Sequence, residues 1–267
     1  MIDVIIPCYN AEKTLSRAIN SVLKQKKLNI LWIIDDCSID SSYELAKNFA
    51  NQFPNKIKVE KLSKNSGVAK ARNWGAINSE SRFIAFLDAD DEYEENALDV
   101  AMAIFEYKPE TCLVRLDLKP IDIDKKYINH PNFNFAWQHM KMTCGGNIVF
   151  NRTFFLACGG FPQNDLFKKF GGEDGALGIA TTKIGLVATA FNNAGVLHHC
   201  RKGMHAERLL DTILFKKTSP DISENDISEA NQITDNICIS IKNLTDILNT
   251  SNIGICPFTV EEHIEKI

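Results

Sequence analysis

The chain has 267 residues, of which 45% are hydrophobic, and its formal net charge is −4. This length and composition suffice for one large buried core, and the acidic balance argues against a general nucleic-acid binder, which needs a basic face for phosphate groups. The eight cysteines form no CxxC pair, so neither a zinc site nor a disulfide framework is predicted. No apolar stretch reaches the length of a bilayer span, and no signal-peptide pattern opens the chain. We therefore predict a cytoplasmic protein with reduced thiols.

Four apolar runs in the first half of the chain are predicted to be strands. They lie at about residues 2–6, 30–35, 57–62 and 82–88, and helical patterns separate them. Alternation of strands with helices predicts an α/β fold with a mostly parallel sheet. In such a sheet, ligands bind beyond the carboxyl ends of the strands.

The clearest helical pattern follows the first strand. Its apolar residues recur at the three- and four-residue spacing of one buried helix face, and Asn10 is the expected N-cap. The residues of this face are Leu15, Ala18, Ile19, Val22 and Leu23.

Polar segments stand where three of the predicted strands end, at residues 7–10, 35–38 and 88–90. Each segment alone is equally well explained as an ordinary turn or as a loop that caps the next helix. Their order and spacing argue against coincidence, as does the segment 65–73, which stands just before the acidic strand end. We expect the three strand ends to converge on one crevice.

The acidic segment 86–91, Phe-Leu-Asp-Ala-Asp-Asp, is the most informative of these. In an extended strand, residues two apart share a face, so Asp88 and Asp90 are expected to point into one cleft, with Ala89 leaving room beside them. Two carboxylates suit Mg²⁺ or Mn²⁺, which also accept diphosphate oxygens. The alternative is a solvated acidic turn.

Together these segments resemble the family 2 glycosyltransferases. The N-terminal half of that family carries a Pro-x-Tyr-Asn strand end, an Asp-Asp-x-Ser loop, a Gly-x-x-x-Ala-Arg-Asn helix and an Asp-x-Asp motif, and all four occur here in order. The resemblance implies the Rossmann-like GT-A fold, a nucleotide-diphosphate-sugar donor, a divalent metal (Mn²⁺ or Mg²⁺) and inversion at the anomeric carbon. We expect a GT-A domain over residues 1–205, with a nucleotide-binding half (1–91), an acceptor-binding half (92–205) and a C-terminal helical extension (206–267).

The resemblance assigns the nucleotide site residue by residue. Pro7 and Tyr9 are similar to the walls of the family's base pocket, and Asp36 to the carboxylate that accepts a hydrogen bond from the base. A uracil imide suits that acceptor, so a UDP-linked donor is expected. Arg72 is similar to the basic residue near the diphosphate, where a guanidinium can grip phosphate oxygens.

The resemblance also implies the metal site and the catalytic base. Asp88 is expected at the ribose or the metal, Asp90 at the metal itself, and Ala89 beside the donor nucleotide. Asp174 matches the second residue of the family's Glu-Asp pair and would take the proton from the attacking hydroxyl, which leaves Glu173 to position the acceptor or to support the start of the helix. The alternative is that two acids merely stabilise the start of a helix through its dipole.

Three histidines, His198, His199 and His205, follow the last strand predicted before the extension. Some relatives supply a further metal ligand from this region, and imidazole can complete such a site. The segment departs from the commoner family pattern of one histidine before a Gly-Ser stretch. We select His199 as the metal ligand and leave the other two as alternatives.

Two glycine-containing segments precede the Glu-Asp pair, at residues 145–150 and 158–162. They resemble the strand and the Gly-Gly-Phe turn of the family, and we interpret them as scaffold for the acceptor cleft, without chemistry of their own. Their glycines could allow close approach of the backbone to a sugar, although a helix C-cap explains Gly159 equally well.

Beyond residue 205, two amphipathic helical patterns are predicted, the second at about residues 226–250. This extension could pack on the core, cover the acceptor or join a homodimer. It lacks the basic face that binds anionic lipid, although peripheral membrane contact stays open.

We expect an inverting transferase that extends a saccharide or glycolipid acceptor of a bacterial surface polysaccharide or lipopolysaccharide. Three other functions are alternatives. An aspartyl-phosphate phosphatase also uses Asp-x-Asp, with the first Asp as nucleophile, but normally opens the chain with it. A nucleotidyltransferase needs a Gly-rich basic loop where this chain has residues 7–10. A catalytically silent nucleotide-sugar or glycan-binding module remains the main alternative, although Asp90 and Asp174 are both intact.

Overall fold

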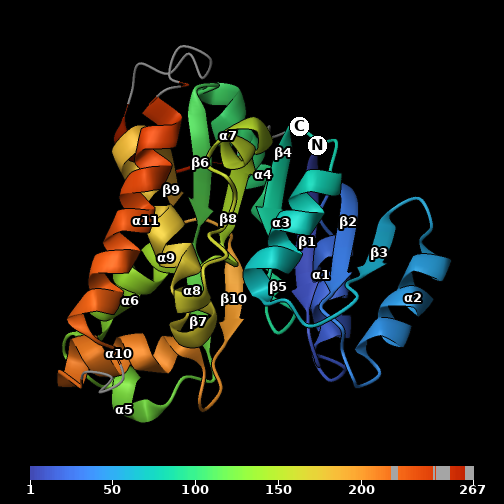
Figure 1. The fold of residues 1–267 in the computed structure, drawn as a ribbon. Coiled ribbons are helices and arrows are strands. Elements are labelled where there is room, and N and C mark those ends of the chain that lie inside the picture. The colour runs from blue at the N-terminus through green and yellow to red at the C-terminus, as the bar shows by residue number, and fades with distance from the viewer. Residues whose placement is uncertain (218–221, 243, 245–252, 262–267) are drawn as a thin grey trace.

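The structure, a computed structural model, describes residues 1–217, 222–242, 244 and 253–261. The first half alternates strands and helices as predicted (Figure 1). Its elements are β1 (Ile2–Cys8), α1 (Leu15–Leu23), β2 (Leu28–Asp35), α2 (Ser42–Gln52), β3 (Ile57–Lys61), α3 (Val68–Asn78), β4 (Phe83–Phe86) and β5 (Glu92–Tyr93).

The second half is richer in helices and supplies the other side of the molecule. Its elements up to the extension are α4 (Ala97–Tyr107), β6 (Thr111–Leu116), β7 (Leu118–Ile121), α5 (Lys125–Ile128), α6 (Phe133–Thr143), β8 (Ile148–Asn151), α7 (Arg152–Ala157), α8 (Asp165–Phe170), α9 (Glu173–Ile184), β9 (Leu186–Ala190) and β10 (Val196–His199). The extension contains α10 (His205–Phe215), α11 (Glu224–Lys242) and β11 (Gly254–Pro257).

In the described part of the chain, an eight-stranded sheet has the order β11-β9-β6-β8-β4-β1-β2-β3, and a three-stranded sheet has the order β5-β10-β7. Strand β1 pairs in parallel with both β2 and β4, and β2 pairs in parallel with β3. Only β8 runs antiparallel to its neighbours in the large sheet as described. The predicted α/β architecture with a mostly parallel sheet is therefore confirmed.

Helices cover both faces of the large sheet. Successive residues of a strand point to opposite sides, so each strand contributes side chains to both layers. Along β1, Val4 and Ile6 belong to one buried cluster with α1, α4, α6 and α10, whereas Ile5 belongs to another with α3, α7, α9 and α11. Gly75 of α3 allows this helix to lie close on the sheet, since a Cβ there would come within 2.6 Å of Ile5. This close packing of helices on the sheet holds the strand ends in place.

The C-terminal extension packs on the core. Buried Ile237 and Ile241 of α11 join the cluster under α9, and Lys183 of α9 forms an ion pair with Asp235 at 3.4 Å. The helices were predicted, but the strand β11, which pairs in parallel with β9, was not. The predicted end of the second helix, near residue 250, lies outside the described residues. None of the helices in the described ranges combines the length and apolar character that a bilayer crossing needs.

The predicted N-cap of the first helix was wrong. Helix α1 begins at Leu15 after Thr14, whereas Asn10 has a left-handed backbone (φ 51°). The Asn10 side-chain oxygen accepts a hydrogen bond from the backbone N–H of Ile39 at 3.0 Å. Asn10 therefore connects the end of β1 to the loop after β2. The sequence alone does not distinguish this role from helix capping, because asparagine is common in both.

Candidate functional site

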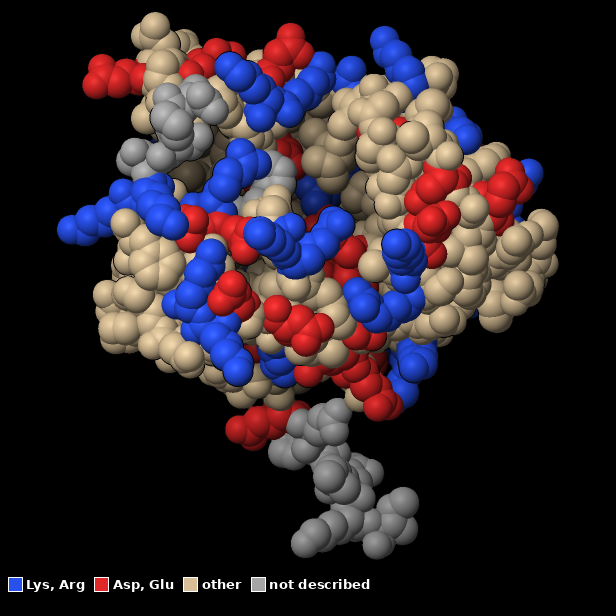
Figure 2. All heavy atoms as spheres, turned by 90° about the horizontal axis from the view of Figure 1, so that it is seen from below, with Lys and Arg blue, Asp and Glu red and all other residues tan. Residues whose placement is uncertain are grey.

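The carboxyl ends of three parallel strands lie side by side, because β4, β1 and β2 are neighbours in the sheet. Figure 2 looks onto this edge of the molecule, where basic and acidic side chains interleave around a hollowed centre. The strand ends predicted to converge are thus brought together. The loops beyond them carry the candidate donor residues.

The nucleotide end of this edge has one open aromatic ring and one buried carboxylate. Tyr9 is 49% exposed, while Pro7 is buried within β1. Asp36 is buried, and its two carboxylate oxygens accept hydrogen bonds at 2.7 Å from the backbone N–H groups of Ser66 and Gly67. Burial raises the pKa of Asp36 despite these bonds. Asp36 thus anchors the loop that starts α3, and its contact with a base stays a prediction.

The acidic segment is a turn, so the predicted extended geometry was wrong. Strand β4 ends at Phe86, and the backbone N–H of Asp91 donates to the carbonyl of Asp88 at 3.1 Å. The physical reason is the third acid. Asp91 is fully buried and accepts hydrogen bonds from the His198 ring at 2.7 Å and from the backbone N–H of His199 at 3.0 Å. The segment folds back on itself because Asp91 bonds to these residues of β10.

A buried arginine joins the donor side of the site to the acceptor side. The Arg72 guanidinium is 2.6 Å from the Asp88 carboxylate and 3.4 Å from that of Glu173, and it lies 5.0 Å over the Phe161 ring. Burial opposes its charge, but Asp88, Glu173 and Asp174 outweigh burial and raise the pKa of Arg72. Arg72 is thus already paired with protein carboxylates, and its predicted grip on a diphosphate stays a prediction.

Two glycines allow this arrangement. A Cβ on Gly145 would come within 2.8 Å of the Arg72 guanidinium, and one on Gly146 within 3.0 Å of the Asp88 carboxylate. The loop between α6 and β8 therefore closes onto a carboxylate–guanidinium pair of the protein. This segment therefore acts as scaffold, and its glycines allow the backbone to approach Arg72 and Asp88 closely.

The acidic pair stands at the start of α9, behind Gly172, whose φ is 96°. Asp174 is half-buried, and its carboxylate accepts hydrogen bonds from the backbone N–H groups of Gly145 at 3.0 Å and Gly175 at 2.8 Å. Burial raises the pKa of Asp174. Burial and the charge of Asp174 raise the pKa of Glu173 to about 6. Such carboxylates suit proton transfer near neutral pH.

The remaining acid of the motif, Asp90, is held on two sides. Its carboxylate lies 2.8 Å from the Arg201 guanidinium, which is 74% exposed, and Arg17 donates a hydrogen bond to its backbone carbonyl. Within the described residues, no three His, Cys, Asp or Glu side chains gather as a preformed metal cage. The donor set nevertheless fits a hard cation, because Asp88 and Asp90 are each about a quarter exposed, at 26% and 24%, and Mg²⁺ or Mn²⁺ takes further oxygens from phosphate and water.

The histidines take different positions. His198 is buried, its Nδ1 pairs with Asp91, and its Nε2 finds no hydrogen-bond partner among the described residues. Burial disfavours its charge, but Asp91 outweighs burial and raises the pKa of His198. His199 points its Nε2 at Glu92, 2.8 Å away, so its predicted metal contact stays a prediction without support from this geometry. His205 opens α10. The sequence motifs did not predict the His198–Asp91 pair. Because adjacent residues of a strand point to opposite faces, the alternation in β10 does indicate that only one of His198 and His199 points inward.

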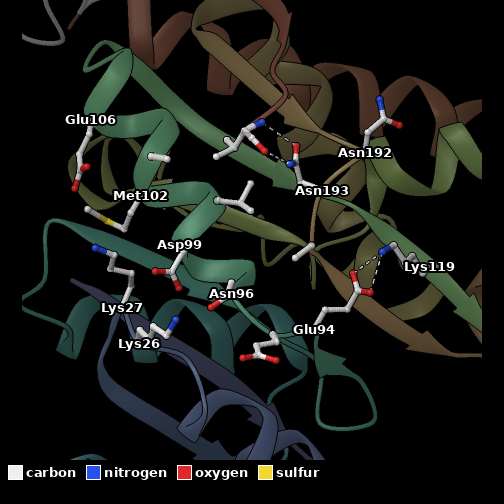
Figure 3. Close-up of a pocket in the computed structure, with 15 residues that line it drawn as sticks. Lys26, Lys27, Glu94, Asn96, Asp99, Met102, Glu106, Lys119, Asn192 and Asn193 are labelled. Atoms are coloured by element: carbon white, nitrogen blue, oxygen red, sulfur yellow. Dashed lines mark hydrogen bonds and ion pairs between the residues drawn. The ribbon is translucent and has the colours of Figure 1, made fainter. Parts of the chain in front are cut away.

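A second hollow, of about 790 Å³, lies away from these residues (Figure 3). Two pairs of its lining residues are bonded to each other. Glu94 pairs with Lys119 at 2.7 Å and accepts from the Gly195 N–H at 2.9 Å, and the Asn193 amide exchanges two hydrogen bonds with the Val260 backbone. None of the predicted site residues lines this hollow. The strand-end site, with its raised carboxyl pKa values, is the candidate active site.

Curated relatives match part of the chain. It is 46% identical over 111 residues to the minor teichoic acid biosynthesis protein GgaA of Bacillus subtilis (strain 168), an alignment that covers 39% of this chain and 25% of GgaA. The chain thus spans about a quarter of the length of that relative.

Solved structures match most of the chain at low identity. S. aureus TarS 1–349 in complex with UDP-GlcNAc superposes with a TM-score of 0.57 at 18% identity, covering 94% of this chain and 76% of that one. The mannosyltransferase PcManGT from Pyrobaculum calidifontis, in complex with GDP-Man and Mn²⁺, superposes with a TM-score of 0.61 at 16% identity, with the same coverages. This likeness confirms the expected GT-A fold. Glycosyl transferase family 2 matches residues 3–161, more than half of the chain, and the protein therefore belongs to that family.

Proposed function

We propose that this chain is an inverting glycosyltransferase that moves a sugar from a nucleotide-diphosphate donor to a hydroxyl of a surface glycan. One observation carries the proposal. A single buried guanidinium, that of Arg72, links Asp88 of the motif turn to Glu173, the neighbour of the candidate base Asp174. A donor site and an acceptor site held this close suit direct transfer between two bound substrates.

The donor end is proposed to take UDP. Tyr9 offers an exposed ring for stacking on a base. Asp36 directly follows β2, and its backbone N–H donates to the carbonyl of Cys8, the residue before Tyr9, at 2.8 Å. The bound UDP-GlcNAc of the TarS neighbour supports a uridine donor, whereas the bound GDP-Man of PcManGT keeps a guanosine donor as an outcome to be tested.

The chemical step is proposed to be a single displacement. The acceptor oxygen attacks the anomeric carbon, the bond from that carbon to the diphosphate oxygen breaks with its electron pair, and Asp174 accepts the acceptor's proton. Held by two backbone N–H groups, the Asp174 carboxylate has a fixed orientation. Its raised pKa makes it a stronger base than an exposed aspartate.

Glu173 has a different role in this scheme. It lies against Arg72 with its pKa raised to about 6, so at neutral pH it is an anion that holds the arginine between the two substrate sites. Asp88 and Asp90 would hold a divalent cation, which when bound neutralises the charge that develops on the departing diphosphate.

The acceptor is proposed from the relatives. GgaA is described as a minor teichoic acid biosynthesis protein, which supports a polymer of the bacterial surface as the acceptor. A saccharide or glycolipid hydroxyl is the chemical class that this reaction requires.

Donor turnover tests the proposal. The protein would be incubated with Mn²⁺ and a panel of UDP-, GDP-, dTDP- and CDP-sugars, with and without a wall-polymer acceptor, and nucleoside diphosphate release would be measured. We expect release from one UDP-sugar that rises with acceptor, falls with chelator and is lost in Asp174→Asn. Binding of a nucleotide sugar without turnover under every condition would instead favour the silent binding module.

A further inference from the structure

A second buried arginine lies behind the acidic pair. Arg115 of β6 is fully buried, and its Nη1 donates hydrogen bonds to the backbone carbonyls of Cys144 at 3.2 Å and Lys141 at 3.5 Å. Its Nε and Nη2 find no hydrogen-bond partner among the described residues. Burying a guanidinium with so few partners is costly, so its presence calls for a physical reason.

One peptide group connects this arginine to Asp174. The carbonyl of Cys144 accepts from Arg115, and the N–H of the same peptide, which belongs to Gly145, donates to the Asp174 carboxylate at 3.0 Å. The two bonds polarise a single amide in the same direction. Hydrogen bonds in such a chain strengthen one another, so a cation on the carbonyl side makes the N–H a better donor to an anion.

A second contact brings Arg115 close to the same helix. A Cβ on Gly178 would come within 2.6 Å of the Arg115 Nη2. Gly178 lies four residues after Asp174, which is one turn along α9. Arg115 thus packs under the first turns of α9 where only glycine leaves room.

The charged and titratable groups facing Asp174 come from several elements: Arg72 of α3, Asp88 of the turn after β4, Glu173 of α9 itself, Cys144 after α6, and Arg115 of β6. Arg72 already compensates Asp88 and Glu173 by direct pairing. Arg115, by contrast, donates in the described residues only to backbone carbonyls. Burial lowers its pKa to about 10, and the negative charge of Asp174 opposes that lowering, so Arg115 is still protonated at neutral pH.

We propose that Arg115 is a positioning residue for the candidate base, acting through the Cys144–Gly145 peptide to orient the Asp174 carboxylate and to keep it ionised. The role rests on the proposed function of Asp174 as the base. Arg115 itself does not touch the substrates in this scheme. Its loss makes Asp174 harder to ionise, so the base is active only at higher pH.

Carboxyl-carbon NMR titration of protein labelled with ¹³C at aspartate tests this directly, with Asp174→Asn used to assign the resonance. In Arg115→Met the titration midpoint of Asp174 is expected about one pH unit above that of the wild type. Arg115→Lys keeps the charge and is expected to titrate near the wild type. The matched control is Arg152→Met, because Arg152 also donates to two backbone carbonyls, those of Ala76 and Ile77, at 2.8 and 3.1 Å.

Thermal unfolding reports whether each variant folds. If Arg115→Met does not, Arg115→Gln, which removes the charge and keeps a donor, carries the same expectation. An unchanged midpoint in a folded, charge-free variant would overturn the proposal, and so would an equal displacement in Arg115→Lys, which would indicate packing instead of charge.

The titration needs no substrate, so its result stands whether or not a nucleotide sugar is turned over. Once a substrate pair is known, the acid limb of the pH profile of kcat should move with the NMR midpoint in Arg115→Met, with KM unchanged. Failure of the proposed function would show instead as full activity in Asp174→Asn. The two failures are therefore distinguishable.

Discussion

Buried carboxylates lie at both ends of the large sheet, and they are treated differently. At the amino end of β1, Asp3 is 2% exposed and its carboxylate is saturated by hydrogen-bond donors from β2 and from the segment before β4. These donors are the side chains of Asn29, Trp32, Ser79 and Ser81 and the backbone N–H of Ile30. Such a fully satisfied carboxylate stabilises the fold.

At the carboxyl end, the acids are crowded and share few donors. Glu173 and Asp174 are adjacent, and burial raises the pKa of both. Arg72 must serve Asp88 and Glu173 together. Burial alone therefore does not distinguish a structural carboxylate from a functional one, whereas incomplete compensation within a cluster makes its members candidates for catalysis.

The largest effect is expected from Asp174→Asn, which keeps the shape of the side chain and removes the base. Transfer should fall by roughly 10²- to 10⁴-fold, while UDP affinity and the unfolding temperature stay near those of the wild type. Steady-state rates and calorimetry measure these quantities. Equal loss of UDP binding would contradict the role given to Asp174.

At the other end of the sheet, Asp3→Ala should mainly cost stability. Removing the carboxylate leaves five donors without their acceptor, so the free energy of unfolding should fall by about 3 kcal/mol. Urea denaturation measures it. The matched control is Asp165→Ala, whose side chain is 95% exposed and pairs only with Lys168 in the described residues, and which should leave the free energy of unfolding close to that of the wild type. Comparable losses in both would break the comparison.

Two glycines sharpen the contrast. Gly145→Ala would push Arg72 from its place and should lower transfer about 10-fold with a small effect on stability, since its neighbour is the end of a long side chain. Gly75→Ala meets Ile5 and Ile34 in the core and should lower the free energy of unfolding by about 1–3 kcal/mol with little effect on rate per folded molecule. Paired rate and denaturation measurements decide it, and the reverse pattern would refute the assignment.

The smallest effect concerns pH and Glu173. Its folded pKa, about 6, lies above the ordinary 4.5, so the folded state holds this proton more tightly than the unfolded state. The resulting stabilisation is present below pH 4.5 and is lost as the pH rises to 6. Glu173→Gln should therefore increase the free energy of unfolding at pH 7 by about 1–2 kcal/mol relative to its effect at pH 4.5. Denaturation at the two pH values tests this, and a difference of the opposite sign would contradict the raised pKa.

How much the sequence could predict depends on whether a feature is local. The four strands of the first half were predicted to within about two residues, because apolar runs with turn residues between them are local signals. The strand β11 was missed because four residues on a sheet edge carry too little pattern. The motif located Asp88 and Asp90 correctly at a strand end but gave them the wrong backbone geometry.

The partners of the site residues could not be predicted, because they are remote in sequence. Arg72 meets Asp88 16 residues away and Glu173 101 residues away, and Asp91 meets His198 after 107. The sequence motifs predicted a phosphate ligand for Arg72 and no role for Asp91. Only the fold reveals that the third acid turns inward to a histidine.

Calorimetric binding of UDP, with Mn²⁺ and with chelator, tests the central claim most directly when wild type is compared with Asp90→Ala. We predict binding to the wild type that requires the metal and is lost in Asp90→Ala, since that carboxylate is proposed to hold the cation beside the diphosphate. Metal-dependent binding that survives in Asp90→Ala, or an absence of binding to the wild type for UDP and for GDP, dTDP and CDP alike, would contradict a donor site at the strand ends.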